Sequence, residues 1–168
     1  MRVIAEPPVV EGFAPFGEVL SIPASGRTFF DGALANLRRR ARPSLSLARK
    51  EEFPGAPPTQ WRMERHAFSS PSLVPLEAGR WLLLVAPDAG GAPDAGGARD
   101  AGGTPDLRAL PSFPCRPAPG VIYRANVCHQ PLSILDRSAV FATFMWRDGG
   151  EGDEGLVTLP APITILAP

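Results

Sequence analysis

The chain contains two histidines, and the residues around each could do chemistry. His66 ends the stretch Met63-Glu64-Arg65-His66, and His129 lies in a second short motif further along the chain. Histidine is the side chain best suited to transferring protons or binding a metal near neutral pH. In a strand, Glu64 and His66 would share one face and Arg65 would point to the other. A proton-transfer or metal site and a purely structural Glu–His pair both fit this pattern.

Short apolar segments separated by turn residues are expected to position these side chains. The chain has 21 prolines and 17 glycines, which disfavour long helices. Such short runs predict a β-sandwich or barrel. The segments expected as strands are 17–22, 45–48, 72–76, 81–85, 120–123, 140–146 and 163–166. The segment 81–85 (Trp-Leu-Leu-Leu-Val) lacks alternation and is expected to be buried on both faces, whereas 32–42 is the best helix candidate.

Composition and charge exclude several classes of protein. The 168 residues are 44% hydrophobic, which is typical of one globular domain and not of a disordered chain. Seventeen basic and seventeen acidic residues cancel, so no global field favours nucleic acid or an anionic membrane. The basic run at 38–42 is interpreted as solvated surface, and nucleic-acid binding through it ranks last among the functions considered. Two cysteines and no long apolar run favour a cytoplasmic protein with reduced thiols.

One segment is low in complexity. From Asp88 a six-residue unit beginning Asp-Ala-Gly-Gly repeats three times. Its only apolar side chains are alanines, which cannot fill the interior of a calcium-binding β-helix. We expect a single domain over 1–168, with a flexible loop inserted at about 88–106.

Several motifs, taken in order, resemble the ureidoglycolate lyase family. Residues 13–20 (Phe-Ala-Pro-Phe-Gly-Glu-Val-Leu) are similar to the family's opening motif, and 63–66 to its Leu-Glu-Arg-His signature. Residues 120–123 (Gly-Val-Ile-Tyr) and 128–132 (Cys-His-Gln-Pro-Leu) match two later motifs. Each motif is weak alone, but their order and spacing are specific, and the resemblance covers nearly the whole chain outside the repeat.

The resemblance implies a fold, a reaction and a set of residues. The fold would be mainly β, a cupin-type antiparallel double-stranded β-barrel, or jelly roll, with few short helices. The reaction would be a carbon–nitrogen lyase step that cleaves ureidoglycolate to glyoxylate and urea in allantoin breakdown. The catalytic candidates are His129, His66, Glu64 and Tyr123, and the candidates for substrate binding are Arg49, Arg65, Arg147 and Gln130.

The resemblance also raises the question of a metal and of departures from the family pattern. Glu64, His66 and His129 are the candidate ligands for a divalent ion, nickel by resemblance, although no cofactor is required by the sequence. Cys128 replaces the family's tryptophan, which we expect to remove packing surface beside the site, and the segment at Trp146 departs from the family's Asp-Arg-Gly-Gly. A cupin binding module without lyase activity is therefore the alternative. A small-molecule substrate, a homodimer and no nucleic-acid or membrane partner are expected.

Overall fold

The computed structural model describes residues 1–4, 10–53, 58–86, 105, 112–115, 119–150 and 154–166, with only the backbone given at 10 and 112–115. The repeat at about 88–106 falls outside the described residues, apart from Pro105. Within the described part of the chain, no helix is long and apolar enough to cross a membrane.

The fold is mainly β, as predicted, and it consists of two sheets. The larger sheet comprises β1 (Arg2–Ile4), β12 (Glu154–Leu166), β4 (Thr59–His66), β9 (Cys128–His129), β6 (Trp81–Ala86) and β10 (Ser133–Ile134), in that order, with β7 (Ser112–Cys115) also pairing with β6. The smaller sheet has the order β2 (Gly17–Leu20), β8 (Gly120–Tyr123), β5 (Ser72–Glu77), β11 (Ala139–Arg147) and β3 (Arg42–Lys50).

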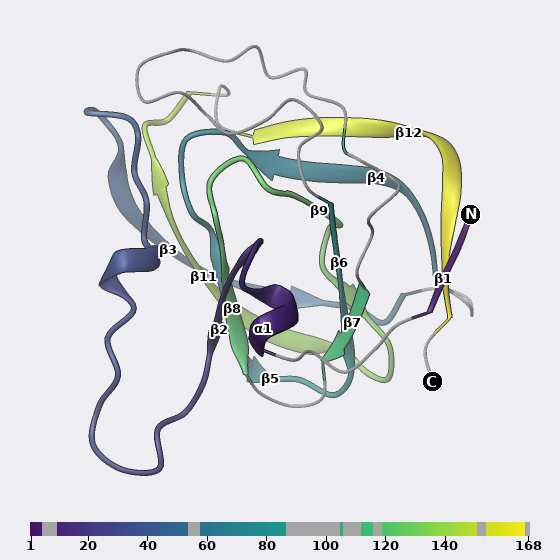
Figure 1. The fold of residues 1–168 in the computed structure, drawn as a ribbon, viewed down its shortest axis with the longest axis horizontal. Helices are drawn as coiled ribbons and strands as arrows, with labels where there is room; N and C mark the ends of the chain where they lie inside the picture. Colours follow the sequence, from purple (N-terminus) through teal and green to yellow (C-terminus); the bar gives the residue numbers. More distant parts are fainter. Residues whose placement is uncertain are drawn as a thin grey trace.

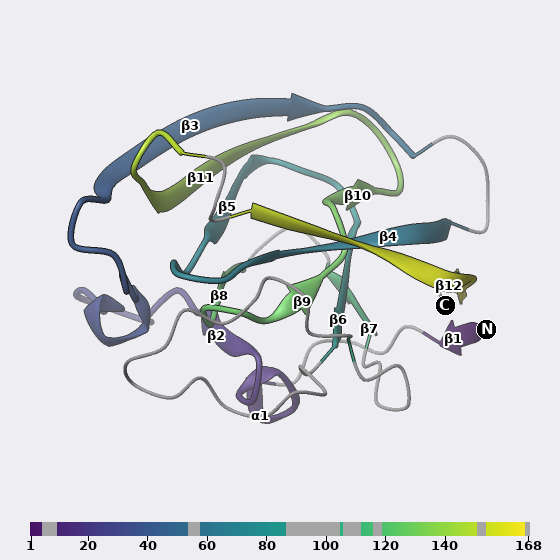
Figure 2. The same ribbon diagram turned by 90° about the horizontal axis from the view of Figure 1, so that it is seen from above.

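The two sheets are arranged as expected for a cupin jelly roll. All strand pairs are antiparallel except β1 with β12. Figure 1 shows β12 and β4 running together on one side of the molecule and β3 with β11 on another. Figure 2 shows the same pairs from above. The described helical segments are one turn each, α1 (Val10–Phe13) and the 3-10 helix η1 (Asp31–Ala33).

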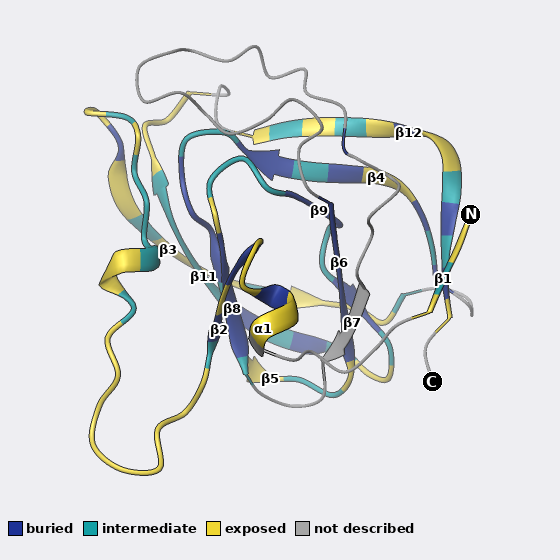
Figure 3. Ribbon diagram, in the orientation of Figure 1, coloured by how far each residue is buried: buried dark blue, intermediate teal, exposed yellow. Residues whose placement is uncertain are grey.

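Strand β6 forms the centre of the core because it is buried on both faces. Trp81, Leu83 and Val85 pack in a first cluster with residues of the smaller sheet. The alternate side chains Leu82 and Leu84 pack in a second cluster beneath β12. All six residues of β6 are at most 1% exposed, which Figure 3 shows as an unbroken buried strand. The prediction from the missing alternation is confirmed, since period-two geometry supplies apolar side chains to both faces.

The prediction of a helix at 32–42 is wrong. The chain there has one 3-10 turn and then runs beside the end of β4, where the N–H of Leu37 donates to the carbonyl of Phe68 at 2.8 Å. Asn36 forms an isolated bridge with Ser69. A helix over these residues would have only a narrow apolar stripe to bury against the core. Pairing with 68–70 instead gives backbone N–H and C=O groups of this segment their hydrogen bonds.

The strands expected from the sequence are present, with different ends. Five are longer than expected: β3, β5, β6 and β11 gain one to five residues, and β12 begins nine residues earlier than the segment expected at 163–166. The strand expected over 17–22 ends at Leu20. The two-residue strands β9 and β10 carry too short a pattern to be read from sequence, yet β9 holds His129.

Candidate functional site

Strands β4 and β9 bring Glu64 and His129 together. The two residues are direct partners in the antiparallel register, so their side chains lie on the same face of the sheet. The His129 Nε2 atom lies 3.5 Å from Glu64 Oε1, and the His129 side chain is only 4% exposed. The pair therefore places the carboxyl group of Glu64 next to the imidazole of His129, with both side chains mostly buried.

His66 completes a three-residue cluster. It lies two residues beyond Glu64 on β4, on the same face as period-two geometry predicts, and its ring stacks on that of His129 with centroids 5.6 Å apart. One ligand atom from each of Glu64, His66 and His129 lies within 4.8 Å of the others. The two histidines, which lie on different strands, therefore belong to one cluster.

Tyr123 reaches the cluster from the smaller sheet. Its ring stacks on the His129 imidazole, with centroids 4.1 Å apart and an interplanar angle of 15°. Tyr123 is 1% exposed and also packs in the first core cluster with Phe13. The ring therefore fixes the plane of the imidazole from the opposite sheet.

The second nitrogen of His129 determines which atom can accept a proton. Nδ1 lies 2.9 Å from the carbonyl oxygen of Val127. A carbonyl oxygen only accepts hydrogen bonds, so Nδ1 carries the hydrogen and donates it. Nε2, which faces Glu64, is then the nitrogen that gains or loses a proton, or that binds a metal.

The surroundings of Glu64 favour its ionised form. Burial raises the pKa of this carboxyl, but the hydrogen bond with His129 and the electrostatic interactions with His129, His66 and Lys50 outweigh it, and the pKa lies below its ordinary value. Glu64 is thus a carboxylate that can orient an imidazole, stabilise an imidazolium or bind a cation.

A pocket of about 340 Å³ opens beside the cluster. Of the three cluster residues, His66 is the one that lines it. Two arginines also line it, Arg147 at the end of β11 and Arg38 from the segment before β3. Asp148 and Glu154 line it as well, and Asp148 forms an ion pair with Arg38. The guanidinium of Arg147 beside the imidazole of His66 is therefore the group suited to a small ligand bearing a carboxylate.

The donor set of the cluster fits a divalent transition metal. Two imidazoles and one carboxylate leave coordination positions for substrate or water. Metal–ligand bonds of ~2.0–2.2 Å place two ligand atoms of one ion no more than ~4.4 Å apart. Small side-chain movements would bring atoms now within 4.8 Å of one another into that range.

The predicted substrate-binding residues are not all brought together. Arg65 is 1% exposed and, by strand alternation, lies on the face of Met63, away from Glu64 and His66. The side-chain amide of Gln130 donates to the carbonyl of Leu82, and its main-chain N–H bonds to Leu84, so the residue ties the chain after β9 to β6.

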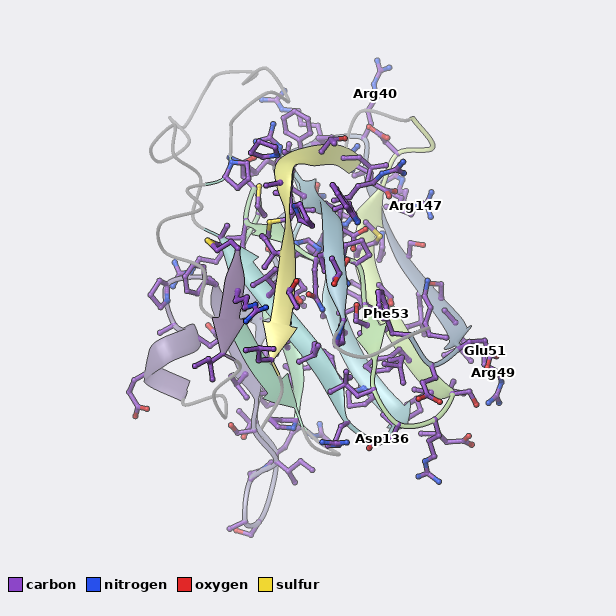
Figure 4. The ribbon with its side chains drawn as sticks, turned by 90° about the vertical axis from the view of Figure 1, so that its right-hand side faces the viewer. Arg40, Arg49, Glu51, Phe53, Asp136 and Arg147 are labelled. Carbon is purple, nitrogen blue, oxygen red and sulfur yellow. The ribbon has the colours of Figure 1, made fainter. Side chains whose placement is uncertain are left out.

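Arg49 and Arg147 lie far apart. Arg49 pairs with Val140, whereas Arg147 pairs with Arg42 at the other end of the same ladder. Seven residues of β11 separate the two positions, which is ~24 Å at ~3.4 Å per residue. Figure 4 shows the exposed Arg49 side chain at the end of β3, well away from Arg147. Of the two, only Arg147 lies at the pocket.

Two features of the site differ from the sequence-based interpretation. The sequence predicts that Arg38 belongs to a solvated basic run, but its side chain is 14% exposed and forms an ion pair with Asp148 at 2.8 Å, whereas Arg39 and Arg40 are exposed. Cys128 was expected beside the site, but it lies in the second core cluster, because alternation along β9 sends it to the face opposite His129. No local pattern separates Arg38 from its basic neighbours, so the sequence could not single it out.

Comparisons with known proteins agree with the resemblance. A family model described as ureidoglycolate lyase matches residues 1–165. A protein named ureidoglycolate lyase from Chelativorans sp. (strain BNC1) is 32% identical over 162 residues, covering 90% of this chain and 88% of the relative. Another protein of that name, from Brucella melitensis biotype 2, is 32% identical over 146 residues, covering 81% of this chain and 78% of the relative.

Proposed function

The chain belongs to the ureidoglycolate lyase family, and we propose that it cleaves ureidoglycolate to glyoxylate and urea. The observation that carries the proposal is the buried cluster of Glu64, His66 and His129 beside a pocket lined by arginine. The same residues have the chemistry that this cleavage requires.

The reaction needs a base, an acid and a cation. The reacting carbon of ureidoglycolate bears a hydroxyl, a carboxylate and the ureido nitrogen. Removal of the hydroxyl proton lets the oxygen form the aldehyde C=O while the C–N bond breaks and its electron pair goes to nitrogen. A proton delivered to that nitrogen completes urea. Proton transfer by positioned side chains typically contributes ~100- to 10,000-fold in rate.

We assign the two proton transfers to the two histidines. To reach His129, the substrate must extend from the pocket past His66 into the cluster. There His129 accepts the hydroxyl proton at Nε2, because its Nδ1–H is engaged by the Val127 carbonyl and the Glu64 carboxylate stabilises the imidazolium that forms. His66, which lines the pocket, donates the proton to the departing nitrogen. Tyr123 keeps the His129 ring in plane by stacking on it.

We assign recognition of the substrate carboxylate to Arg147. It is the predicted substrate-binding arginine that lines the pocket with His66. A guanidinium group matches a carboxylate with two parallel hydrogen bonds, which fixes orientation as well as charge. Neither Arg65, which is buried on the other face of β4, nor the distant Arg49 is included in this assignment.

As an alternative to these proton-transfer roles, Glu64, His66 and His129 would hold a divalent ion, with nickel the expectation from the family resemblance; a His129 Nε2 that binds the ion would not accept the hydroxyl proton. Such an ion supplies Lewis acidity, lowering the pKa of a hydroxyl bound to it. The alternative, a binding module without lyase activity, rested partly on the expectation that Cys128 in place of tryptophan disturbs the site. Cys128 lies in the second core cluster and not at the site, so this argument no longer applies.

Release of urea and glyoxylate from the purified protein, with and without added divalent metal, tests the proposal. His129→Ala is expected to abolish release and leave the fold intact, whereas Arg147→Ala should raise KM. Arg40→Ala is the matched control, since Figure 4 shows this side chain directed away from the molecule. Wild-type protein that releases no urea under any metal condition would leave the binding module as the better description.

The homodimer and the cytoplasmic location expected from the sequence remain predictions. Sedimentation of the purified protein tests the first, and fractionation of the cells that make it tests the second.

A further inference from the structure

Arg38 bridges the two walls of the pocket. One wall includes His66 at the end of β4 with Glu154 and Leu156 of the paired strand β12, and the other is the end of β11 at Arg147 with the turn residues Asp148 and Gly149. Arg38 lines the pocket between them and comes from neither element. Its contacts therefore bear on how far apart the two walls stand.

On the β11 side, Arg38 makes two contacts. Its Nη1 atom pairs with Asp148 Oδ2 at 2.8 Å, and its Nη2 atom donates to the carbonyl of Trp146 at 3.0 Å. Arg147 lies between these two residues in the chain. Asp148 Oδ1 also accepts the N–H of Gly150 at 3.0 Å, which ties the turn to itself. The backbone on both sides of Arg147 is thus held by one guanidinium group.

On the β4 side, Arg38 is anchored two residues after His66. Its guanidinium lies over the Phe68 ring, with the central carbon 5.8 Å from the centroid. The preceding residue, Leu37, donates its N–H to the Phe68 carbonyl. The main-chain N–H of Arg38 is bonded to the Asn36 side chain at 3.1 Å. The backbone of Arg38 and the face of its guanidinium are therefore held on the β4 side of the pocket, while its Nη1 and Nη2 atoms contact the β11 side.

From these contacts we infer that Arg38 is a positioning residue, which holds Arg147 at a set distance from His66 through Asp148 and the Trp146 carbonyl. Arginine suits this task because its planar fork serves two acceptors at once while its face stacks on an aromatic ring. Lysine has one ammonium and no plane, so it cannot make the same three contacts. The inference rests on the proposed function of the pocket for its kinetic consequence, but its structural part is independent of that function.

The kinetic test compares Arg38→Met with the exposed control Arg40→Met. If Arg147 binds the carboxylate in the ground state and the transition state alike, displacing it raises KM more than it lowers kcat. We expect Arg38→Met to raise KM for ureidoglycolate on the order of 10-fold, with Arg38→Lys between it and wild type. Arg40→Met should match wild type.

A double-mutant comparison tests the route through Asp148. Asp148→Asn keeps an oxygen for the Gly150 N–H but removes the charge that Arg38 binds. We expect it to raise KM, and to add less than its own factor when combined with Arg38→Met, because both changes break the same contact. Factors that simply multiply would overturn this route.

A structural readout separates this inference from the proposed function. Hydrogen exchange of the amides at 146–150 should increase several-fold in Arg38→Met and stay unchanged in Arg40→Met. Unchanged exchange in Arg38→Met overturns the inference, and so does faster exchange with an unaltered KM. If wild-type protein releases no urea, the proposed function fails, and the exchange measurement alone decides whether Arg38 holds the turn.

Discussion

Replacing Cys128 with tryptophan, the residue at this position in the motif that 128–132 resembles, is expected to destabilise this protein and not to improve its site. Cys128 is fully buried among Met63, Leu84 and Ala86 in the second core cluster. His129, the next residue, points to the other face of β9. The indole would therefore enter a filled core and would not extend a wall of the pocket.

The expected size of the effect follows from that packing. Overfilling a well-packed core typically costs ~1–3 kcal/mol, because side chains leave their preferred rotamers and the backbone shifts. An indole N–H that finds no acceptor there costs ~1–3 kcal/mol more. In a domain of this size 1 kcal/mol corresponds to ~2–4 °C in Tm, so the packing cost alone predicts a decrease of roughly 2–12 °C.

Thermal unfolding followed by circular dichroism measures this change, and a urea-release assay runs beside it. Cys128→Val is the matched control, since it keeps the site small and apolar and should stay within ~1.5 kcal/mol of wild type. Higher urea release from Cys128→Trp together with an unchanged or higher Tm would refute the reasoning, because it would place the indole at the site and not in the core.

Three further predictions concern the elements that hold the site. Leu83→Ala should lower the free energy of unfolding in urea by about 3–5 kcal/mol, because Leu83 is 1% exposed in the first core cluster; a cost below ~1 kcal/mol would contradict its burial. Gly17→Ala should cost more than ~2 kcal/mol, since its Cβ would lie 1.9 Å from a carbonyl oxygen of β8, whereas Gly32→Ala meets nothing within 4 Å and should be close to neutral; equal Tm values for the two variants would be the contrary result. The hydrogen bond and charge of Arg80 hold the pKa of Asp136 below its ordinary value, so this pair adds stability above the unfolded-state pKa of ~3.9 that is lost as the pH falls through the lower folded-state pKa. Asp136→Asn should lower the Tm slightly at pH 7 and progressively less as the pH falls, because the pair is exposed to solvent; a loss independent of pH would exclude the ion pair as its source.

The sequence by itself determined the fold class, and it singled out Glu64, His66 and His129, which the structure brings into one cluster. Uninterrupted apolar character in β6 predicts burial on both faces, because a strand has only two faces and both must then meet apolar neighbours. The spacing of Glu64 and His66 places them on one face for the same reason, and it sends Arg65 to the other. The order of the motifs indicated the family. These are local properties, which the chain fixes through the period of the strand.

The tertiary structure decided which distant residues meet. The pairing of Glu64 with His129 depends on the register of β4 with the two-residue strand β9, and the stacking of Tyr123 depends on the second sheet. Arg38 differs from its basic neighbours only through contacts with the turn after β11, more than a hundred residues away. The residues next to Arg38 in the sequence do not show that it meets this turn. The contact depends on how the strands of the whole sheet pair and pack, and not on the residues on either side of Arg38.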